Sequence, residues 1–298
     1  MFGIHTEFNS NKRKESIIND VLTREQKSHG VLNVHRINEK NVGDYYCAPH
    51  LYFDELKDKK LDISDFRSIF KKKTDNWISQ ISNNDLILGG GGLLNIKHFK
   101  MQMELFEKLA SNGKKIVIWG AGHNEINLDD YHKNQKYWID VNKFGLVGTR
   151  DFSFPGEWIP CVSCLNPVFN KTHTEEYEVG LLFNAKSIKD DKLIKKLEKY
   201  PQSSNTTNLE EMINFIGKCE TLVTNSYHAM YWAILMEKKV VSIPATSKFF
   251  DFKYKTPITS FEDFENEIKN ATKYTGVLEE CREINLKFAD KTFDYLNL

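Results

Sequence analysis

A run of four glycines is the most unusual feature of this sequence that could serve chemistry. Gly89, Gly90, Gly91 and Gly92 follow a short apolar run and precede a stretch with helical periodicity at residues 93–110. Backbone without side chains lets N–H groups approach an anion, and the positive end of a following helix would favour the same charge. The pattern lacks both the Gly-Lys-Ser/Thr of a nucleotide-binding P-loop and the GxGxxG of a dinucleotide fold. A tight strand-to-helix turn is the structural alternative.

Two short polar motifs lie where other predicted strands end. Asn41, Gly43 and Asp44 belong to an Asn-Val-Gly-Asp corner after the first strand, and Arg150 and Asp151 follow a later strand. Open α/β sheets bind ligands at the carboxyl ends of their strands. A guanidinium at that edge could hold a carboxylate or a phosphate through two hydrogen bonds. Helix capping by Asp44 and a surface Arg–Asp pair are the structural alternatives.

His228 is the histidine best placed for chemistry. It lies in a Thr-Asn-Ser-Tyr-His sequence that closes one predicted strand and opens a helix, so its imidazole would point from a helix N-terminus toward a cleft. That position suits a general acid or an anion ligand. Lys248 lies in a later loop of alternating lysines and aromatic residues, where it could contact a sugar or phosphate at the cleft rim. A solvated loop packed by its own aromatic side chains is the alternative.

The cysteines do not suggest a metal site. Cys161 and Cys164 form a single CxxC, whereas a zinc site needs four ligands and no second pair has suitable spacing. A redox motif normally opens a helix, but prolines flank this pair. Five cysteines scattered along the chain are typical of reduced thiols in a cytoplasm. We therefore expect no metal, no disulfide framework and a cytoplasmic protein.

The composition is that of a folded protein with balanced charge. Of 298 residues 40% are hydrophobic, and 41 basic residues match 41 acidic ones. This length suits two domains, and the balance excludes a global attraction to nucleic acid or anionic lipid. No apolar run is long enough to span a bilayer, and the N-terminal segment lacks the apolar core of a signal peptide.

Short apolar runs that alternate with helical patterns predict an α/β protein built from parallel βαβ units. Three of the seven prolines fall within residues 155–167, where we place the crossing between domains at residues 1–165 and 166–298. Strands are predicted at residues 31–37, 85–88, 115–119, 145–149, 177–183, 221–224 and 239–243. Helices are predicted at residues 45–56, 93–110, 188–200, 209–219 and 227–236, with a helical tail from residue 261. Two Rossmann-like domains facing a cleft are the fold that this order favours.

Taken in order, the motifs resemble the polysaccharide pyruvyl transferase family. The matching segments are Asn41-Val-Gly-Asp44, Asp85-Leu-Ile-Leu-Gly-Gly-Gly-Gly92, Ile118-Trp-Gly-Ala-Gly122, Gly148-Thr-Arg-Asp151 and Thr224-Asn-Ser-Tyr-His-Ala229. The helix, short turn and strand at residues 233–243 also look like the family's, so the resemblance extends from residue 41 to about residue 255. It implies two domains arranged as in the GT-B glycosyltransferases.

The resemblance also implies a reaction. A pyruvyl group would move from phosphoenolpyruvate onto two hydroxyls of a sugar in a bacterial surface glycan, as a cyclic ketal. His228 would protonate the methylene carbon, while Arg150 and the glycine amides would hold carboxylate and phosphate. The expected partners are phosphoenolpyruvate and a sugar or lipid-linked glycan, with no cofactor. A lipid-linked acceptor would bring the protein to the inner face of the plasma membrane, to which the basic segment at residues 189–199 would contribute.

Two positions depart from the family pattern. Ser226 stands where many members carry an arginine, so one phosphate-binding charge is missing or is supplied elsewhere, for which Lys248 is a candidate. Asn166 precedes Pro167 where an aspartate is common. Two alternatives therefore stay open: a GT-B-type glycosyltransferase that uses a nucleotide sugar, and a non-catalytic protein that binds a glycan or an anion.

Overall fold

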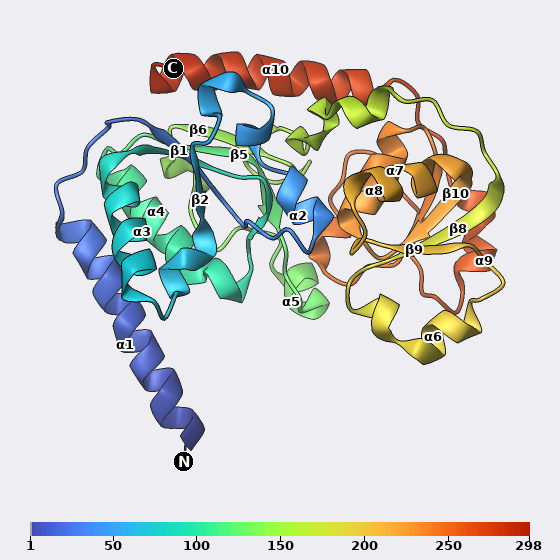
Figure 1. Cartoon of the computed structure of the whole chain (residues 1–298), viewed down its shortest axis with the longest axis horizontal. Helices are drawn as coiled ribbons and strands as arrows, with labels where there is room; N and C mark the ends of the chain where they lie inside the picture. Colours follow the sequence, from blue (N-terminus) through green and yellow to red (C-terminus); the bar gives the residue numbers. More distant parts are fainter. Residues whose placement is uncertain (1) are drawn as a thin grey trace.

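Two parallel β-sheets organise the molecule, one in each half of the chain (Figure 1). The computed structural model describes residues 2–298. The first sheet contains β1 (Val31–His35), β2 (Lys60–Asp62), β3 (Asp85–Leu88), β4 (Gly91–Leu94), β5 (Ile116–His123), β6 (Leu146–Thr149) and β7 (Glu157–Trp158). The second contains β8 (Tyr177–Phe183), β9 (Gln202–Ser204), β10 (Cys219–Thr224) and β11 (Lys239–Ser242). The prediction of two Rossmann-like α/β domains is confirmed.

Helices flank both sheets (Figure 1). In the first half they are α1 (Phe2–Thr23), α2 (Val42–Tyr46), α3 (Lys71–Asn83), α4 (Lys100–Ser111) and α5 (Leu128–Lys133). In the second half they are α6 (Asp191–Lys196), α7 (Leu209–Lys218), α8 (Tyr227–Leu235), α9 (Phe264–Glu267) and α10 (Val277–Leu296). Short 3-10 turns include η1 (Pro49–Leu51), η2 (Asp54–Leu56), η3 (Ile63–Arg67), η4 (Lys97–Phe99), η5 (Val141–Lys143), η6 (Val162–Leu165), η7 (Pro167–Asn170), η8 (Ser187–Lys189), η9 (Ser247–Phe249) and η10 (Ile268–Asn270).

The strand order creates a switch point in each sheet. The first sheet has the order β2-β1-β3-β5-β6-β7, with β4 also paired to β5, and the second has the order β11-β10-β8-β9. In the first sheet, β2 and β3 therefore lie on opposite sides of β1. In the second sheet, β9 and β10 lie on opposite sides of β8. Loops that leave neighbouring strands in opposite directions open a crevice at their carboxyl ends, where such folds bind ligands.

Several predicted elements have other bounds in the structure. The helix predicted at residues 45–56 is a short α2 followed by two 3-10 turns, because Pro49 has no N–H for a continued helix. The helix predicted from residue 93 begins at Lys100, and β4 occupies the start of that segment by pairing with β5. The helix at residues 209–218 is as expected, and Asn208 caps it by accepting a hydrogen bond from the Glu211 amide at 2.9 Å.

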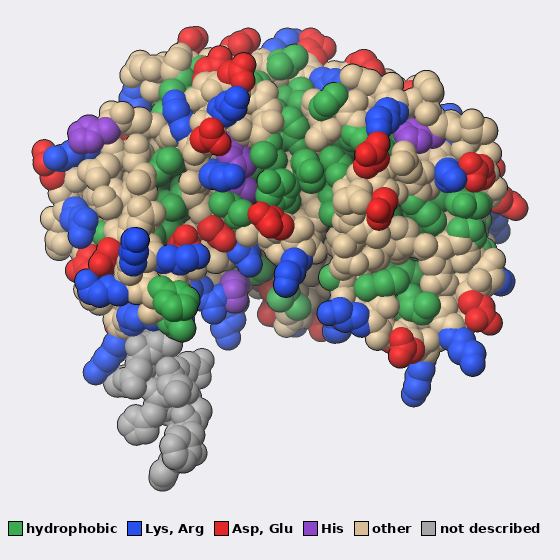
Figure 2. Space-filling model, in the orientation of Figure 1, with side chains coloured by type: hydrophobic (Ala, Val, Ile, Leu, Met, Phe, Trp, Pro, Cys, Tyr) green, Lys and Arg blue, Asp and Glu red, His purple; other side chains and the backbone are tan. Residues whose placement is uncertain are grey.

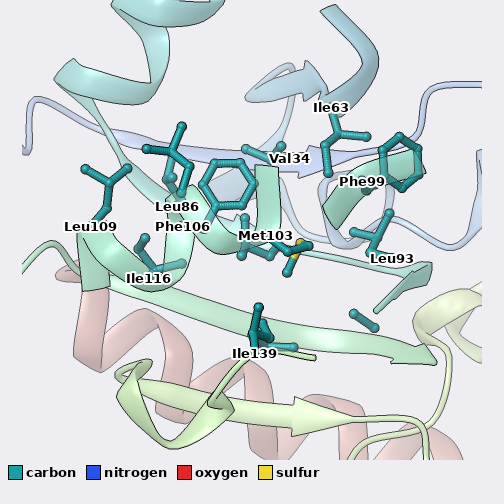
Figure 3. Close-up of a cluster of buried hydrophobic side chains, with 14 of the residues drawn as sticks. Val34, Ile63, Leu86, Leu93, Phe99, Met103, Phe106, Leu109, Ile116 and Ile139 are labelled. Atoms are coloured by element: carbon teal, nitrogen blue, oxygen red, sulfur yellow. The ribbon is translucent and has the colours of Figure 1, made fainter. Parts of the chain in front are cut away.

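The core of the first domain lies between its sheet and helices α3 and α4. Leu86 and Ile116 come from the sheet and pack with Phe106 of α4, and all three are fully buried (Figure 3). Trp77 of α3 is also fully buried and contacts Phe106 with ring centroids 6.1 Å apart. Burial of one such side chain contributes roughly 2 kcal/mol, so this layer fixes the strand ends that carry the polar motifs.

The C-terminal helix α10 packs on the first sheet, although the sequence placed it with the second domain. Figure 1 shows it running from the second domain across the first. Phe288 and Leu296 join a buried cluster with Trp119 of β5, and the indole N–H of Trp119 donates to Asn285 at 3.0 Å. The large indole needs both apolar cover and an acceptor, and α10 provides them. The division at residue 165 stays a prediction.

Acid should destabilise the fold through His35, at the carboxyl end of β1. This side chain is 1% exposed, and neither ring nitrogen has a hydrogen-bond partner. Burial, and next the neighbouring His50, lower its pKa from 6.5 to about 3. Between these values the unfolded state binds more protons, so stability is present above pH 6.5 and is lost as the pH falls. The loss for this group at pH 5 is about 2 kcal/mol.

We therefore expect His35→Leu to flatten the pH dependence of the free energy of unfolding between pH 7 and pH 5. Urea unfolding at both pH values measures this, with the exposed His29→Leu as the matched control. An unchanged slope in His35→Leu would contradict the prediction.

Candidate functional site

A cavity of about 210 Å³ lies where side chains from both halves of the chain meet. A larger hollow of about 620 Å³ lies on the outer side of α4, but no strand-end motif reaches it, so we assign the site to the smaller one. The residues that line the smaller cavity are Arg36, Asp44, Cys47, Gly90, Gly91, Gly92, Leu93, Ile96, His98, Phe99, Asn124, Arg150, His228 and Lys248. The structure thus brings together most of the residues that the motifs singled out.

The Asn41 corner positions His228. Helix α2 contacts α8 so closely that a Cβ atom on Gly43 would lie 2.1 Å from the His228 Nδ1 atom. The amide of Asn41 donates to the Asp44 carboxylate at 3.0 Å, which orients Asp44 beside the cavity. Asn41 and Gly43 therefore lie behind the cavity wall as supports and do not line it. Burial raises the pKa of Asp44, against the opposing charges of Lys248 and Arg150.

Burial disfavours the protonated form of His228. This residue is 6% exposed, and its Nε2 atom lies 3.7 Å from the Cys161 thiol. Burial, followed by the charges of Arg150 and Lys248, lowers its pKa well below 6.5. An anion that neutralised the two cations would remove the second and third of these causes and raise the pKa.

Arg150 presents a buried guanidinium to the cavity. Its side chain is 2% exposed, and its Cζ atom lies 4.1 Å from the centre of the Tyr227 ring, a cation–π contact. One amino group donates to the His123 carbonyl at 3.4 Å, while the Nε atom has no partner. A Cβ atom on Gly122 would lie 2.6 Å from that Nε atom, so the Gly-x-Gly motif provides the room. A buried donor without a partner is expected to be completed by a ligand.

Lys248 adds a second cation from the other domain. Burial, and next the charge of Arg150, lower its pKa from 10.5 to about 8, while Asp44 opposes the shift. The η9 turn that carries Lys248 is fixed to the first domain through Ser247. Its hydroxyl is 2.8 Å from the His123 Nδ1 atom and accepts from the Glu125 amide at 2.7 Å. Lys248 is thus held in place by bonds made across the two domains.

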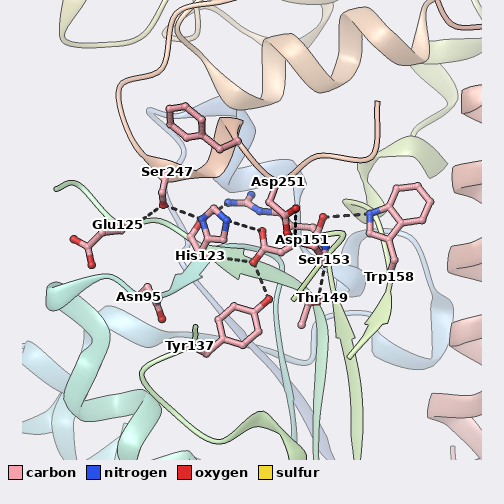
Figure 4. Close-up of polar contacts among 12 residues, drawn as sticks. Asn95, His123, Glu125, Tyr137, Thr149, Asp151, Ser153, Trp158, Ser247 and Asp251 are labelled. Atoms are coloured by element: carbon pink, nitrogen blue, oxygen red, sulfur yellow. Dashed lines mark hydrogen bonds and ion pairs between the residues drawn. The ribbon is translucent and has the colours of Figure 1, made fainter. Parts of the chain in front are cut away.

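Asp151 belongs to this interdomain network and does not form the surface pair that was one alternative for Arg150. Its carboxylate accepts from the His123 amide at 2.7 Å and from the Tyr137 hydroxyl at 2.8 Å (Figure 4). Burial raises its pKa to about 7 despite the nearby Arg150 charge. Asp251 of the second domain accepts from the Ser153 hydroxyl at 2.8 Å in the same region.

The glycines shape the cavity wall in a different way from the one predicted. The N–H group of Gly90 donates to the Cys47 carbonyl at 3.1 Å, and no helix N-terminus follows the run because β4 intervenes. A Cβ atom would lie 1.9 Å from the Trp119 carbonyl oxygen at Gly89 and 2.2 Å from the Cys47 carbonyl oxygen at Gly90. The expectation of a helix dipole at this anion site is therefore wrong, and close backbone packing explains these two glycines.

Sequence reasoning missed three polar residues of the cavity, Arg36, Asn124 and His98. Arg36 directly follows β1 and forms an ion pair with Asp62 at 2.8 Å. Its place after a strand is the signal that could have found it, but a single arginine forms no motif. Ser226, in contrast, lies at the N-cap position of α8 without a capping side-chain hydrogen bond, is 5% exposed and does not line the cavity.

The described part of the chain has neither a cluster of metal-binding side chains nor a membrane-spanning helix. Among the side chains of residues 11–298, no cluster of three or more His, Cys, Asp or Glu is suited to hold a metal ion. None of the helices described is both long and apolar enough to span a bilayer.

Comparison with known proteins finds a family similarity within the second half of the chain. A sequence profile described as polysaccharide pyruvyl transferase matches residues 168–247. None of the curated proteins matches the chain. A functionally uncharacterised protein from Klebsiella pneumoniae subsp. pneumoniae NTUH-K2044 is similar at 14% identity and a TM-score of 0.37, over 78% of this chain and 88% of that one.

An α-glucosyltransferase solved with UDP and a 13-mer DNA is similar at 10% identity and a TM-score of 0.42, over 89% of this chain and 94% of that one. Both structural likenesses are too distant to bear on function. The profile match, however, falls on the domain that supplies His228. The resemblance to the polysaccharide pyruvyl transferase family is therefore confirmed over residues 168–247, which include the motif at residues 224–229.

Proposed function

We propose that the protein transfers the pyruvyl group of phosphoenolpyruvate to two hydroxyls of a glycan sugar, as a cyclic ketal. The observation that carries this proposal is the meeting of Arg150, Lys248 and His228 in one small cavity between the two halves of the chain. Phosphoenolpyruvate is compact and bears a carboxylate and a phosphate, so it needs more than one cation. Lys248 is available for the charge that an arginine at position 226 would have supplied, and Arg36, which pairs with Asp62, adds a further cation to the cavity wall.

His228 is the proton donor in this scheme. Bound phosphoenolpyruvate neutralises Arg150 and Lys248, so the pKa of the His228 imidazole rises and the ring takes up a proton. The imidazolium gives this proton to the methylene carbon, which becomes a methyl group, while a sugar hydroxyl bonds to the adjacent carbon and passes its own proton to the imidazole. The second hydroxyl then displaces phosphate from that carbon, and its proton leaves with the phosphate.

The direct test is phosphate release. The purified protein should release inorganic phosphate only when both phosphoenolpyruvate and a sugar acceptor are present, and the product should carry a ketal methyl signal in its NMR spectrum. Turnover with a nucleotide sugar alone would favour the glycosyltransferase alternative and contradict the proposal. Binding of phosphoenolpyruvate without turnover on any acceptor would favour a non-catalytic protein.

Arg150→Ala should weaken phosphoenolpyruvate binding by about 10- to 100-fold, because charge-assisted hydrogen bonds from a buried guanidinium are lost. Arg150→Lys should fall between this variant and the wild type, since it keeps the charge but not the paired donors. Calorimetric titration measures both, with the exposed Arg24→Gln as control. Equal affinity in Arg150→Ala and the wild type would remove Arg150 from the donor site.

A further inference from the structure

A second depression, here called the basic groove, adjoins the cavity. It has a volume of about 420 Å³, and its lining residues are Lys14, Arg67, Ile96, Lys97, His98, Met101, Gln102 and Ile126. Ile96 and His98 also line the smaller cavity, so the two spaces share a wall. A ligand in the basic groove would therefore lie next to a donor held by Arg150.

The charges of the basic groove are uniformly positive. Among the side chains described, those of residues 11–298, no carboxylate forms an ion pair with Lys14, Arg67 or Lys97, and no acidic residue lines the groove. The Arg67 guanidinium contacts the His98 Nε2 atom. Burial, and next the charges of Arg67, Arg36 and Lys14, lower the pKa of His98, so the charged form of the imidazole is disfavoured. Lys and Arg side chains also gather along this edge of the molecule in Figure 2, near the N-terminal helix.

The groove also has features that suit a sugar. Gln102 is 1% exposed, yet its amide Nε2 atom has no hydrogen-bond partner, so a buried donor awaits an oxygen acceptor. Ile96 and Met101 give the groove an apolar side, and Ile126 stands 68% exposed at its edge. Sugar rings pack their C–H faces on such surfaces and offer hydroxyl oxygens to amides.

We propose that the basic groove is the acceptor subsite and that its ligand is a sugar bearing an anionic group, either a phosphate ester or a carboxylate. Lys14, Arg67 and Lys97 bind the anionic group, and Gln102 donates to an oxygen of the sugar. The ligand's role as acceptor rests on the transfer reaction proposed above, whereas anion binding by the groove can be measured without turnover.

The test is calorimetric titration of the full chain at low salt with glucose 1-phosphate, glucuronate and the neutral methyl glucoside. We expect the wild type to bind an anionic sugar at least about tenfold more tightly than the neutral one. Lys14→Gln/Lys97→Gln should lose most of this preference while it keeps the wild-type affinity for phosphoenolpyruvate. Lys192→Gln/Lys195→Gln changes the net charge equally on exposed positions of α6 and should bind as the wild type does.

The outcomes separate this site from the donor site. Preference for glucose 1-phosphate identifies a phosphate ester as the anionic group, and preference for glucuronate identifies a carboxylate. Equal binding of neutral and anionic sugars, or an unchanged preference in Lys14→Gln/Lys97→Gln, would overturn the proposal. Inorganic phosphate bound as tightly as glucose 1-phosphate would also overturn it, because the groove would then recognise no sugar. A protein that binds anionic sugars here but never releases phosphate would refute the transfer reaction and leave the groove assigned.

Discussion

Gly43→Ala should lower the turnover rate at least about 100-fold and destabilise the protein by about 1–3 kcal/mol. The new Cβ atom would lie 2.1 Å from Nδ1 and 2.5 Å from Cγ of the His228 ring. These atoms lie close to the His228 backbone and cannot move aside as the end of a long side chain can. Either α2 or the imidazole must therefore shift. Phosphate release and urea unfolding measure the two losses.

Two further variants distinguish the effect of this clash from the general effect of replacing a glycine. In Gly30→Ala the nearest atom to the new Cβ is the Asn84 Oδ1 atom at 3.2 Å, the end of a side chain, so that variant should stay near the wild type. Gly43→Ala/His228→Ala removes the ring that is struck and should recover much of the lost stability without recovering turnover. Turnover in Gly43→Ala within twofold of the wild type would show that the close α2–α8 contact does not matter.

His228→Gln should lower the rate of ketal formation by about 10²- to 10⁴-fold, the range for loss of a general acid. Phosphoenolpyruvate affinity should change little, because Arg150 and Lys248 stay in the cavity. In the wild type we expect turnover to fall as the pH rises through the imidazole pKa of the donor complex, since only the protonated ring donates.

His173→Gln, in the second domain and away from the cavity, is the matched control and should keep the wild-type rate. Rapid-quench measurement of a single turnover isolates the chemical step from product release. A His228→Gln variant that turns over at the wild-type rate would assign the proton-donor role to another group, for which Lys248, which also lines the cavity, is a candidate.

The convergence of Asp44 and Arg150 could be predicted because each follows a strand of the first sheet, and parallel strands end at one edge. His228 follows β10 of the second sheet, so its approach could be predicted only from the expectation that the two domains face one cleft. The bounds of β3 and β8 could be predicted for a related reason, since their apolar runs are short and sharply bounded. These signals are local in sequence. The chemical roles of the residues stay predictions.

Features that depend on distant partners were beyond the sequence. The segment after Gly90 has helical periodicity, yet it begins as β4 because Gly91 and Leu94 meet β5 some 30 residues later. Arg36 and Asn124 enter the cavity as single residues without a motif. The place of α10 could not be predicted because its apolar face fits either sheet as a pattern, and its contacts with the first sheet, such as the bond between Trp119 and Asn285, join residues far apart in sequence.

The place of α10 also sets an order for biosynthesis. The strands of the first sheet leave the ribosome early, but the buried cluster around Trp119 lacks Phe288 and Leu296 until the last segment of the fold has been made. During translation that surface stays uncovered while the second domain, whose strands end at residue 242, can already condense. Of the two domains, the one that emerges first is therefore expected to complete its core last. A nascent chain halted before α10 should expose the apolar surface of β5 to chaperones.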